Sequence, residues 1–256
     1  MKLLTSILAV AILSMPLMQA KDLKVFELRT YTANGDKLDA LHDRFRGHTL
    51  ALFEKHGMTN LIYWVPEDNE ANQLVYLLGY PNREARDKSW KDFRNDADWK
   101  AAYNASIADG KLVAKVDSLF LELTDYSPSL ETLKTDPSRL YEMRHYTTNS
   151  GKLPKLDARF RDHTVELFEK HGMNNLPYFH LSEGQDGSGT TLLYFLSFKD
   201  VASRDASFKA FSQDPDWIKA RDKSQADGEK ILIKKGVASI YLKTTDYSPE
   251  KGLAAK

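Results

Sequence analysis

Two patterns of apolar and polar residues alternate along the chain and predict strands and helices in a fixed order. Residues 24–31 alternate at period two, as a half-buried strand does, and residues 140–146 repeat the pattern. Apolar residues then recur at steps of three and four, which predicts an amphipathic helix with a single buried stripe. The stripe comprises Leu38, Leu41, Phe45, His48 and Leu52, and later Leu153, Leu156, Phe160, His163 and Leu167. Gly57 and Gly172 follow the two stripes, where a left-handed C-terminal cap is expected.

The remaining elements follow in the same order in both halves of the chain. Each half continues with two short apolar runs that predict a strand pair, then a long helical region, then a last strand. The motif Asp-x-Asp-Trp predicts a second helix start inside the helical region. Its first residue, Asp96 or Asp214, is a typical N-cap, and Pro215 suits the first helical position. The ranges are 61–65, 74–78, 83–107 and 116–123 in the first half and 176–180, 192–196, 201–226 and 238–243 in the second.

The two halves are copies of one unit. Between Arg44 and Asn60, 13 of 17 positions are identical to those between Arg159 and Asn175. The offset is 115, and a repeat this long indicates two whole domains rather than a solenoid. We therefore divide the chain into a first domain at 21–126, a linker at 127–139 and a second domain at 140–256.

Each copy reads β-α-β-β-α-β, which is the order of a ferredoxin-like split unit of the α+β class. Such a sheet carries helices on one face only, so its other face needs cover. Two copies in one chain can supply that cover to each other by packing sheet against sheet. The sequence therefore predicts an intrachain pseudo-dimer, and it leaves further association into a homo-oligomer open.

Several motifs resemble those of NIPSNAP domains, which belong to the dimeric α/β-barrel superfamily. They are the openings Phe-Glu-Leu-Arg-Thr-Tyr and Tyr-Glu-Met-Arg-His-Tyr, the Phe-Arg-x-His-Thr helix and the Asp-Pro-Asp-Trp helix start. The resemblance covers nearly all of the chain after residue 20 and implies a barrel built from the two copies. It implies little about chemistry, because the family has no generally established activity, although its superfamily includes cofactor-free monooxygenases, isomerases and haem enzymes. Eukaryotic members are mitochondrial. This chain differs from them in its expected export signal and its duplication, so their protein partners are not carried over.

Composition narrows the location and the class of partner. Lysine plus arginine equals aspartate plus glutamate at 36 each, and no basic block interleaves with aromatic residues, so we expect no nucleic-acid partner. Residues 1–20 have the charge, apolar run and terminal Ala of a secretory signal peptide, which predicts export to the periplasm or the medium. The apolar run is too short for a membrane anchor, so we expect no stable membrane insertion. The chain has no cysteine, which excludes disulfides and thiolate chemistry.

His48 and His163 are the first candidates for chemistry, because each interrupts an otherwise apolar helix stripe. A neutral imidazole between helix and sheet could act as a general base, together with Tyr63 or Tyr178, or as a haem ligand. The structural alternative is a buried histidine that is hydrogen-bonded to strand backbone or to those same tyrosines.

A second candidate set combines acid, guanidinium and phenol on one face of each opening strand, the face expected to lie against the other sheet. Buried charges of this kind have to be paired. The set would form an anion-binding pocket around two arginines, or a self-satisfied Glu–Arg network across the pseudo-twofold axis. Its members are Glu27, Arg29, Tyr31, Glu142, Arg144 and Tyr146.

Other conspicuous residues receive structural interpretations. The arginines of the repeated helix are expected to face solvent or to pair with nearby acids. They are Arg44, Arg46, Arg159 and Arg161. Trp99 and Trp217 are expected to fix a helix from the core. We expect no metal site and no cofactor, because the sequence has no metal-ligand spacing, phosphate-binding loop or nucleophile elbow.

The sequence thus predicts an exported tandem protein that binds a small apolar or anionic ligand, or a protein partner, without catalysis. The alternative is a cofactor-independent monooxygenase or isomerase that uses His48 or His163, and a haem-dependent variant is the third hypothesis.

Overall fold

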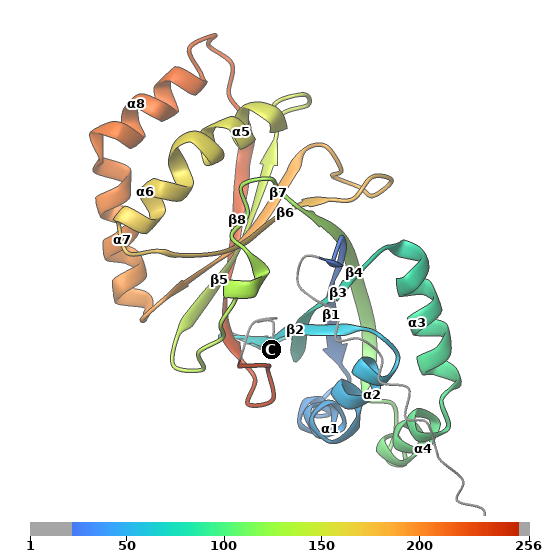
Figure 1. Cartoon of the computed structure of the whole chain (residues 1–256). Helices are drawn as coiled ribbons and strands as arrows, with labels where there is room; N and C mark the ends of the chain where they lie inside the picture. Colours follow the sequence, from blue (N-terminus) through green and yellow to red (C-terminus); the bar gives the residue numbers. More distant parts are fainter. Residues whose placement is uncertain (1–21, 251–256) are drawn as a thin grey trace, which may run out of the picture.

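The computed structural model describes residues 22–250, in which the two halves of the chain fold as matching units (Figure 1). The predicted signal peptide at 1–20 lies outside the described residues. The elements of repeat 1 are β1 (Val25–Ala33), α1 (Leu38–Arg44), the π-helical segment η2 (Phe45–Thr49), α2 (Leu50–Lys55), β2 (Thr59–Pro66), β3 (Gln73–Tyr80), α3 (Arg83–Asn95), α4 (Ala97–Ser106) and β4 (Val113–Leu123).

Repeat 2 has the same elements in the same order, after a linker that contains the short 3-10 turn η3 (Leu130–Thr132). They are β5 (Leu140–Thr148), α5 (Leu153–Arg159), the π-helical segment η4 (Phe160–Thr164), α6 (Val165–Lys170), β6 (Asn174–Leu181), β7 (Thr191–Phe198), α7 (Val201–Gln213), α8 (Pro215–Ser224) and β8 (Leu232–Thr244).

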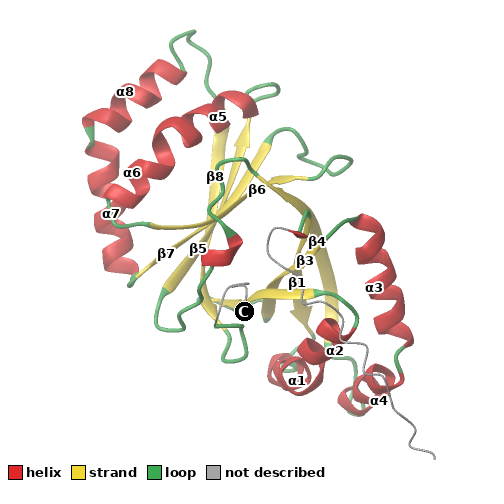
Figure 2. Ribbon diagram, viewed as in Figure 1, coloured by secondary structure: helices red, strands yellow, loops and turns green. Residues whose placement is uncertain are grey.

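The eight strands close into one antiparallel barrel in the order β1-β3-β2-β8-β5-β7-β6-β4. Each repeat supplies four consecutive strands, and the two seams are β2 with β8, through Trp64 opposite Thr244, and β4 with β6, through Leu121 opposite Leu181. Figure 2 shows the helices of each repeat on the outer side of its own sheet. The predicted α+β fold and intrachain pseudo-dimer are thereby confirmed.

Three hydrophobic cores hold this arrangement together. The barrel interior is filled by both repeats, with Trp64 stacked on Phe195 at 4.9 Å between ring centroids and Phe26 against Phe179 at 5.3 Å. A second core lies between the sheet and helices of repeat 1, and a third lies at the same place in repeat 2. Because the inner core belongs to neither repeat alone, the bare sheet faces are covered as the sequence predicted.

The predicted helix boundaries also hold. Gly57 and Gly172 end the first helix of each repeat with φ near +77°, the left-handed conformation that a C-terminal cap requires. The long helical region is broken at Asp96, whose carboxylate accepts hydrogen bonds from the backbone N–H groups of Asp98 and Trp99 and so starts α4.

The two faces of the opening strands are assigned the wrong way round in the sequence interpretation. Phe26 and Leu28 point into the barrel, and Glu27, Arg29 and Tyr31 point toward the helices of their own repeat. The physical reason is that the barrel interior meets only another sheet, where aromatic and aliphatic residues pack without unpaired charge. On the outer face, helix side chains reach the charged groups and pair with them.

Candidate functional site

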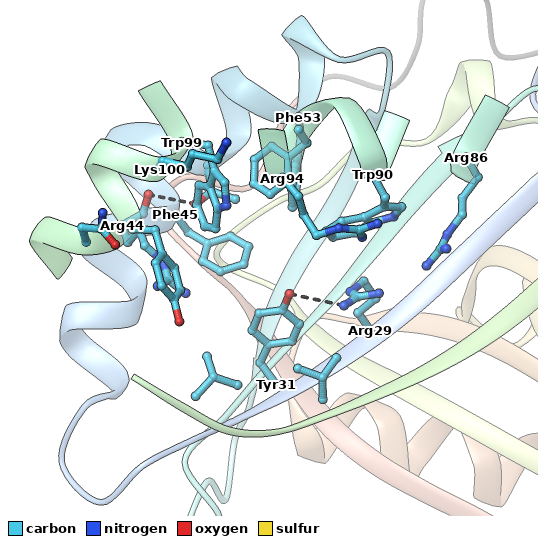
Figure 3. Close-up of a pocket in the computed structure, with 16 residues that line it drawn as sticks. Arg29, Tyr31, Arg44, Phe45, Phe53, Arg86, Trp90, Arg94, Trp99 and Lys100 are labelled. Atoms are coloured by element: carbon cyan, nitrogen blue, oxygen red, sulfur yellow. Dashed lines mark hydrogen bonds between the residues drawn. The ribbon is translucent and has the colours of Figure 1, made fainter. Parts of the chain in front are cut away.

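A cavity of about 610 Å³ lies between the sheet and the helices of repeat 1 (Figure 3). Strands β1 and β4 form its floor, the α1–η2–α2 helix one wall, and α3 and α4 the other. Aromatic rings and cations dominate the lining, and none of the described residues that line it is acidic. The lining residues are Arg29, Tyr31, Arg44, Phe45, Thr49, Phe53, Arg86, Trp90, Phe93, Arg94, Trp99, Lys100, Tyr103, Asn104, Val113 and Val116.

Arg44 is a buried cation in this cavity without an anionic partner. Its side chain belongs to a residue only 5% exposed, its Nη1 donates to Ser106 Oγ at 3.2 Å, and its Nε has no acceptor. The guanidinium carbon lies 5.3 Å from the ring centroid of Trp99 and 5.4 Å from that of Tyr103. Burial lowers the pKa of Arg44, and only tyrosines act against that shift. Since cation–π contacts return about 2 kcal/mol and burying an unpaired charge costs several, the site favours an incoming anion.

Arg44 ends α1 on its buried face, three residues after Leu41, and the π-helical segment η2 follows it directly. The backbone N–H of Leu50 donates to the carbonyl of Phe45, five residues earlier, so the turn holds one residue more than an α-helical turn. The inner face therefore passes from Phe45 to Thr49, and His48 falls outside it. The Thr49 hydroxyl donates to the Arg44 carbonyl at 3.1 Å. Turns of this kind are frequent at functional sites.

Glu27 organises the far wall of the cavity through several donors on one carboxylate. Arg86 donates to both of its oxygens at 2.8 and 2.6 Å, Trp90 Nε1 at 3.1 Å and Ser118 Oγ at 2.6 Å, and Arg29 Nη1 also donates. Burial raises the pKa of Glu27, but the bonds from Arg86 and the charge of Arg29 outweigh it and hold the pKa at about 2. Two arginines share one carboxylate, so this wall retains a positive charge.

Repeat 2 has a smaller cavity of about 240 Å³ at the equivalent place. It is bounded by Arg159, Phe160, Trp217 and Tyr146, the counterparts of Arg44, Phe45, Trp99 and Tyr31. It does not reach the repeat 2 counterparts of Arg29, Arg86 and Trp90. The charged network of repeat 2 is nevertheless formed, since Arg144 and Arg204 both donate to Glu142.

The predicted placement of His48 and His163 is wrong. Both residues are exposed, and neither lines the helix–sheet cavity of its repeat. Phe45 and Leu52, which share the predicted stripe, are buried as expected. The cause is the extra residue in each π-helical turn, which moves Thr49 and Thr164 to the buried face instead.

Tyr63 and Tyr178, the proposed partners of those histidines, are buried and bonded elsewhere. The Tyr63 hydroxyl donates to Asn60 Oδ1 at 2.5 Å and the Tyr178 hydroxyl to Asn175 Oδ1 at 2.6 Å. Burial raises the pKa of each phenol well above its usual value. Both therefore remain protonated at neutral pH.

The charged candidates of the opening strands come together within each repeat, and the expected network across the pseudo-twofold axis is not what forms. Arg29 donates to Glu27 and, at 3.3 Å, to the Tyr31 hydroxyl. Arg144 donates in the same way to Glu142 and, at 3.1 Å, to the Tyr146 hydroxyl. The barrel separates the two sets, because each set faces the helices on the outer side of its own sheet. Of the six residues, Arg29 and Tyr31 line the larger cavity and Tyr146 the smaller one.

Sequence reasoning missed the residues that give the cavities their charge. Arg44 and Arg159 were expected in solvent or beside acids, and they are buried without acids. Arg46 and Arg161 behave as expected, since they are exposed and pair with Asp246 and Asp125. A signal for the buried pair exists in hindsight, because Arg and Thr five residues apart fit one face of a π-helical turn. Trp99 and Trp217 pack at the edge of a core as predicted, but they also line the cavities.

Within residues 22–250, no three His, Asp or Glu side chains are grouped so that they could hold a metal ion. No helix among the same residues has the length and apolar character needed to span a membrane.

A closed barrel of two ferredoxin-like units places the protein among the dimeric α/β-barrel proteins, with both halves of the barrel in one chain. The chain belongs to the NIPSNAP family, whose sequence model matches residues 26–128 and 141–249. Each match spans nearly one repeat, so both repeats are NIPSNAP domains.

Solved structures share the fold at low sequence identity. An anthrone oxidase-like protein is 9% identical with a TM-score of 0.59, covering 94% of this chain and 100% of its own. A candidate monooxygenase from Lactobacillus acidophilus NCFM is 10% identical with a TM-score of 0.55, covering 91% and 98%. A NIPSNAP family protein from Agrobacterium tumefaciens C58 is 21% identical over 41% of this chain and 96% of its own, with a TM-score of 0.37. No curated protein sequence matches the chain.

Proposed function

We propose that the protein binds a small, largely aromatic or aliphatic molecule with an anionic group in the cavity of repeat 1. The signal-like residues 1–20 support placing this activity outside the cytoplasm. The observation that carries the proposal is Arg44, a buried guanidinium with a free Nε in a cavity that no described acidic residue lines. A carboxylate or phenolate would supply the missing counter-charge.

The rest of the cavity suits the apolar part of such a ligand. Its volume of about 610 Å³ lies in the range that holds a drug-sized molecule. Phe45, Phe53, Trp90 and Trp99 offer ring faces and edges for stacking. In Figure 3 these rings and the Arg44 side chain surround the same space, so one ligand could meet both at once.

The experiment is a calorimetric titration with 2-naphthoate and with its neutral counterpart 2-naphthalenemethanol. Losing one charged hydrogen-bonding partner costs about 1.5–3 kcal/mol, so Arg44→Gln should weaken naphthoate binding roughly 10- to 100-fold and leave the alcohol unchanged. Arg159→Gln in repeat 2 is the matched control, since it removes an equally buried arginine from the other cavity. Equal naphthoate affinity in wild type and Arg44→Gln would refute the proposal.

The geometry gives less support to the catalytic alternative built on His48 and His163. Both are exposed, and no described histidine or carboxylate lines the repeat 1 cavity to act as a base. We therefore place binding ahead of monooxygenase or isomerase activity. Oxygen uptake with naphthol-type phenols that is lost in His48→Ala would reverse that order.

A further inference from the structure

The smaller cavity of repeat 2 differs from its counterpart in the positions of its cations as well as in size. Arg159 is 7% exposed, its Nη1 donates to Ser224 Oγ at 3.3 Å, and its Nε has no acceptor. A second guanidinium, that of Arg221, lines the same cavity, where repeat 1 has Tyr103. Lys230 is a third cation in the lining, and no described residue of the lining is acidic.

The positive charges of Arg159 and Arg221 repel each other across this cavity. Burial lowers the pKa of Arg159, and the positive charge of Arg221 lowers it further, with only tyrosines acting in the opposite direction. Arg221 pairs with the carboxylate of Asp222. Its Nε donates to Asp222 Oδ1 at 2.9 Å, and its Nη2 lies 2.8 Å from the same oxygen. That pair is largely exposed and therefore weak, and Arg221 Nη1 has no part in it.

The walls limit how large an occupant can be. Phe160, Phe168, Phe211 and Trp217 enclose about 240 Å³, well under half of the repeat 1 cavity. The space does not extend to the positions that match Arg29 and Trp90, so a ligand that fills the repeat 1 cavity does not fit. A short molecule whose charge is large for its size does fit.

We propose that repeat 2 holds a separate site for a compact dianion, such as a short dicarboxylate, clamped between Arg159 and Arg221. One acidic group would meet the buried guanidinium beside Trp217, and the other would meet Arg221 nearer the surface. Bidentate pairing with carboxylates is the geometry that guanidinium groups favour. The duplicated chain would then carry two sites of different ligand class, a feature that does not depend on the proposal for repeat 1.

The test is calorimetric titration with malonate and with acetate in a buffer of low chloride. Wild type should bind one malonate per chain and prefer it to acetate by at least tenfold. Arg221→Tyr installs the repeat 1 residue at a partly exposed position, so it should fold normally, lose at least tenfold in malonate affinity and lose the preference over acetate. Arg159→Gln should abolish binding, and Arg44→Gln should leave it unchanged.

Three results would overturn the site: no malonate binding at 10–20 mM, unchanged affinity in Arg221→Tyr, or loss of malonate binding in Arg44→Gln. The last result would place the dianion in repeat 1. Failure of the repeat 1 proposal is visible separately, as naphthoate binding that does not respond to Arg44→Gln.

Discussion

Glu27 and Arg44 are both buried charges, yet they affect stability in opposite ways. Glu27 meets two guanidinium groups, an indole N–H and two hydroxyls, so its ionised form is stabilised in the folded chain. Arg44 meets one hydroxyl and two aromatic rings, which do not neutralise it. Glu27 therefore stabilises the fold, whereas burying Arg44 costs free energy that only a bound ligand would offset.

The pKa of Glu27, lowered from 4.5 to about 2, makes folding depend on pH. A lowered folded-state pKa adds stability above pH 4.5, and this stability is lost as pH falls toward 2, a total of about 3 kcal/mol. Glu27→Gln should therefore be less stable than wild type by about that amount at pH 7, with the difference closing as pH falls from 4.5 to 2. Urea unfolding at several pH values measures it, with the exposed Glu122→Gln as control. Parallel curves for wild type and Glu27→Gln would contradict the assignment.

Removing the charge of Arg44 should not destabilise the ligand-free protein. Arg44→Met keeps most of the apolar stem and removes the unpaired guanidinium, so the free energy of unfolding should stay constant or rise by about 1 kcal/mol. Arg29→Met is the contrast, because it breaks a paired buried charge and should cost about 3–5 kcal/mol. Thermal and urea unfolding measure the stability of both variants. A loss of several kcal/mol in Arg44→Met would mean that its contacts with Trp99 and Tyr103 are structural.

At the scale of elements, the π-helical turns decide what the cavities contain. Each turn places a threonine on the buried face, beside the arginine that precedes the turn, and leaves a histidine in solvent. The same geometry occurs in both repeats, with Thr164 Oγ1 donating to the Arg159 carbonyl at 3.0 Å. The threonine hydroxyl thus donates to the carbonyl of the arginine whose side chain is buried in the cavity.

Thr49→Val tests that role with little change in shape. The valine cannot donate to the buried Arg44 carbonyl, so the variant should lose about 1–3 kcal/mol of stability and bind naphthoate less tightly. Thr49→Ser keeps the hydroxyl and should retain both properties more closely. Thr164→Val should show the same loss of stability with unchanged naphthoate affinity. If valine and serine behave alike at position 49, the hydroxyl has no part in holding the turn.

At the scale of the whole molecule, the repeats are tied together by exchanged ends as well as by the barrel. The Tyr247 hydroxyl, after the last strand of repeat 2, lies 2.7 Å from His42 Nδ1 on the first helix of repeat 1. Tyr126, after the last strand of repeat 1, donates to Asp157 on the first helix of repeat 2 at 2.8 Å. Each repeat therefore fixes the helix that bounds the other's cavity.

Cooperative unfolding follows from this exchange and from the shared inner core. Trp64→Ala removes a ring that stacks on Phe195 of the other repeat and should cost about 3–5 kcal/mol. Both repeats should lose protection together, because neither can keep its sheet face covered alone. Hydrogen exchange followed by mass spectrometry measures the protection of each repeat separately. Protection retained in repeat 2 after repeat 1 has opened would show independent domains.

The sequence by itself determined the duplication, the order of elements, the caps at Gly57 and Asp96, and the need for two sheets to face each other. These depend on local spacing and on identity between copies, which no tertiary contact can alter. Alternation along β1 separated Glu27, Arg29 and Tyr31 correctly from Phe26 and Leu28. It could not say which set faces the barrel, because both faces of that strand are covered.

Only the tertiary structure decided the faces and the sites. A stripe at steps of three and four admits His48 or Thr49 equally, and the choice depends on one extra residue in a turn whose hydrogen bonds the sequence does not display. The cavities arise where helices from distant parts of the chain meet the sheet. Whether Arg44 finds a carboxylate there depends on side chains from α4 and β4, about 50 to 80 residues away along the chain.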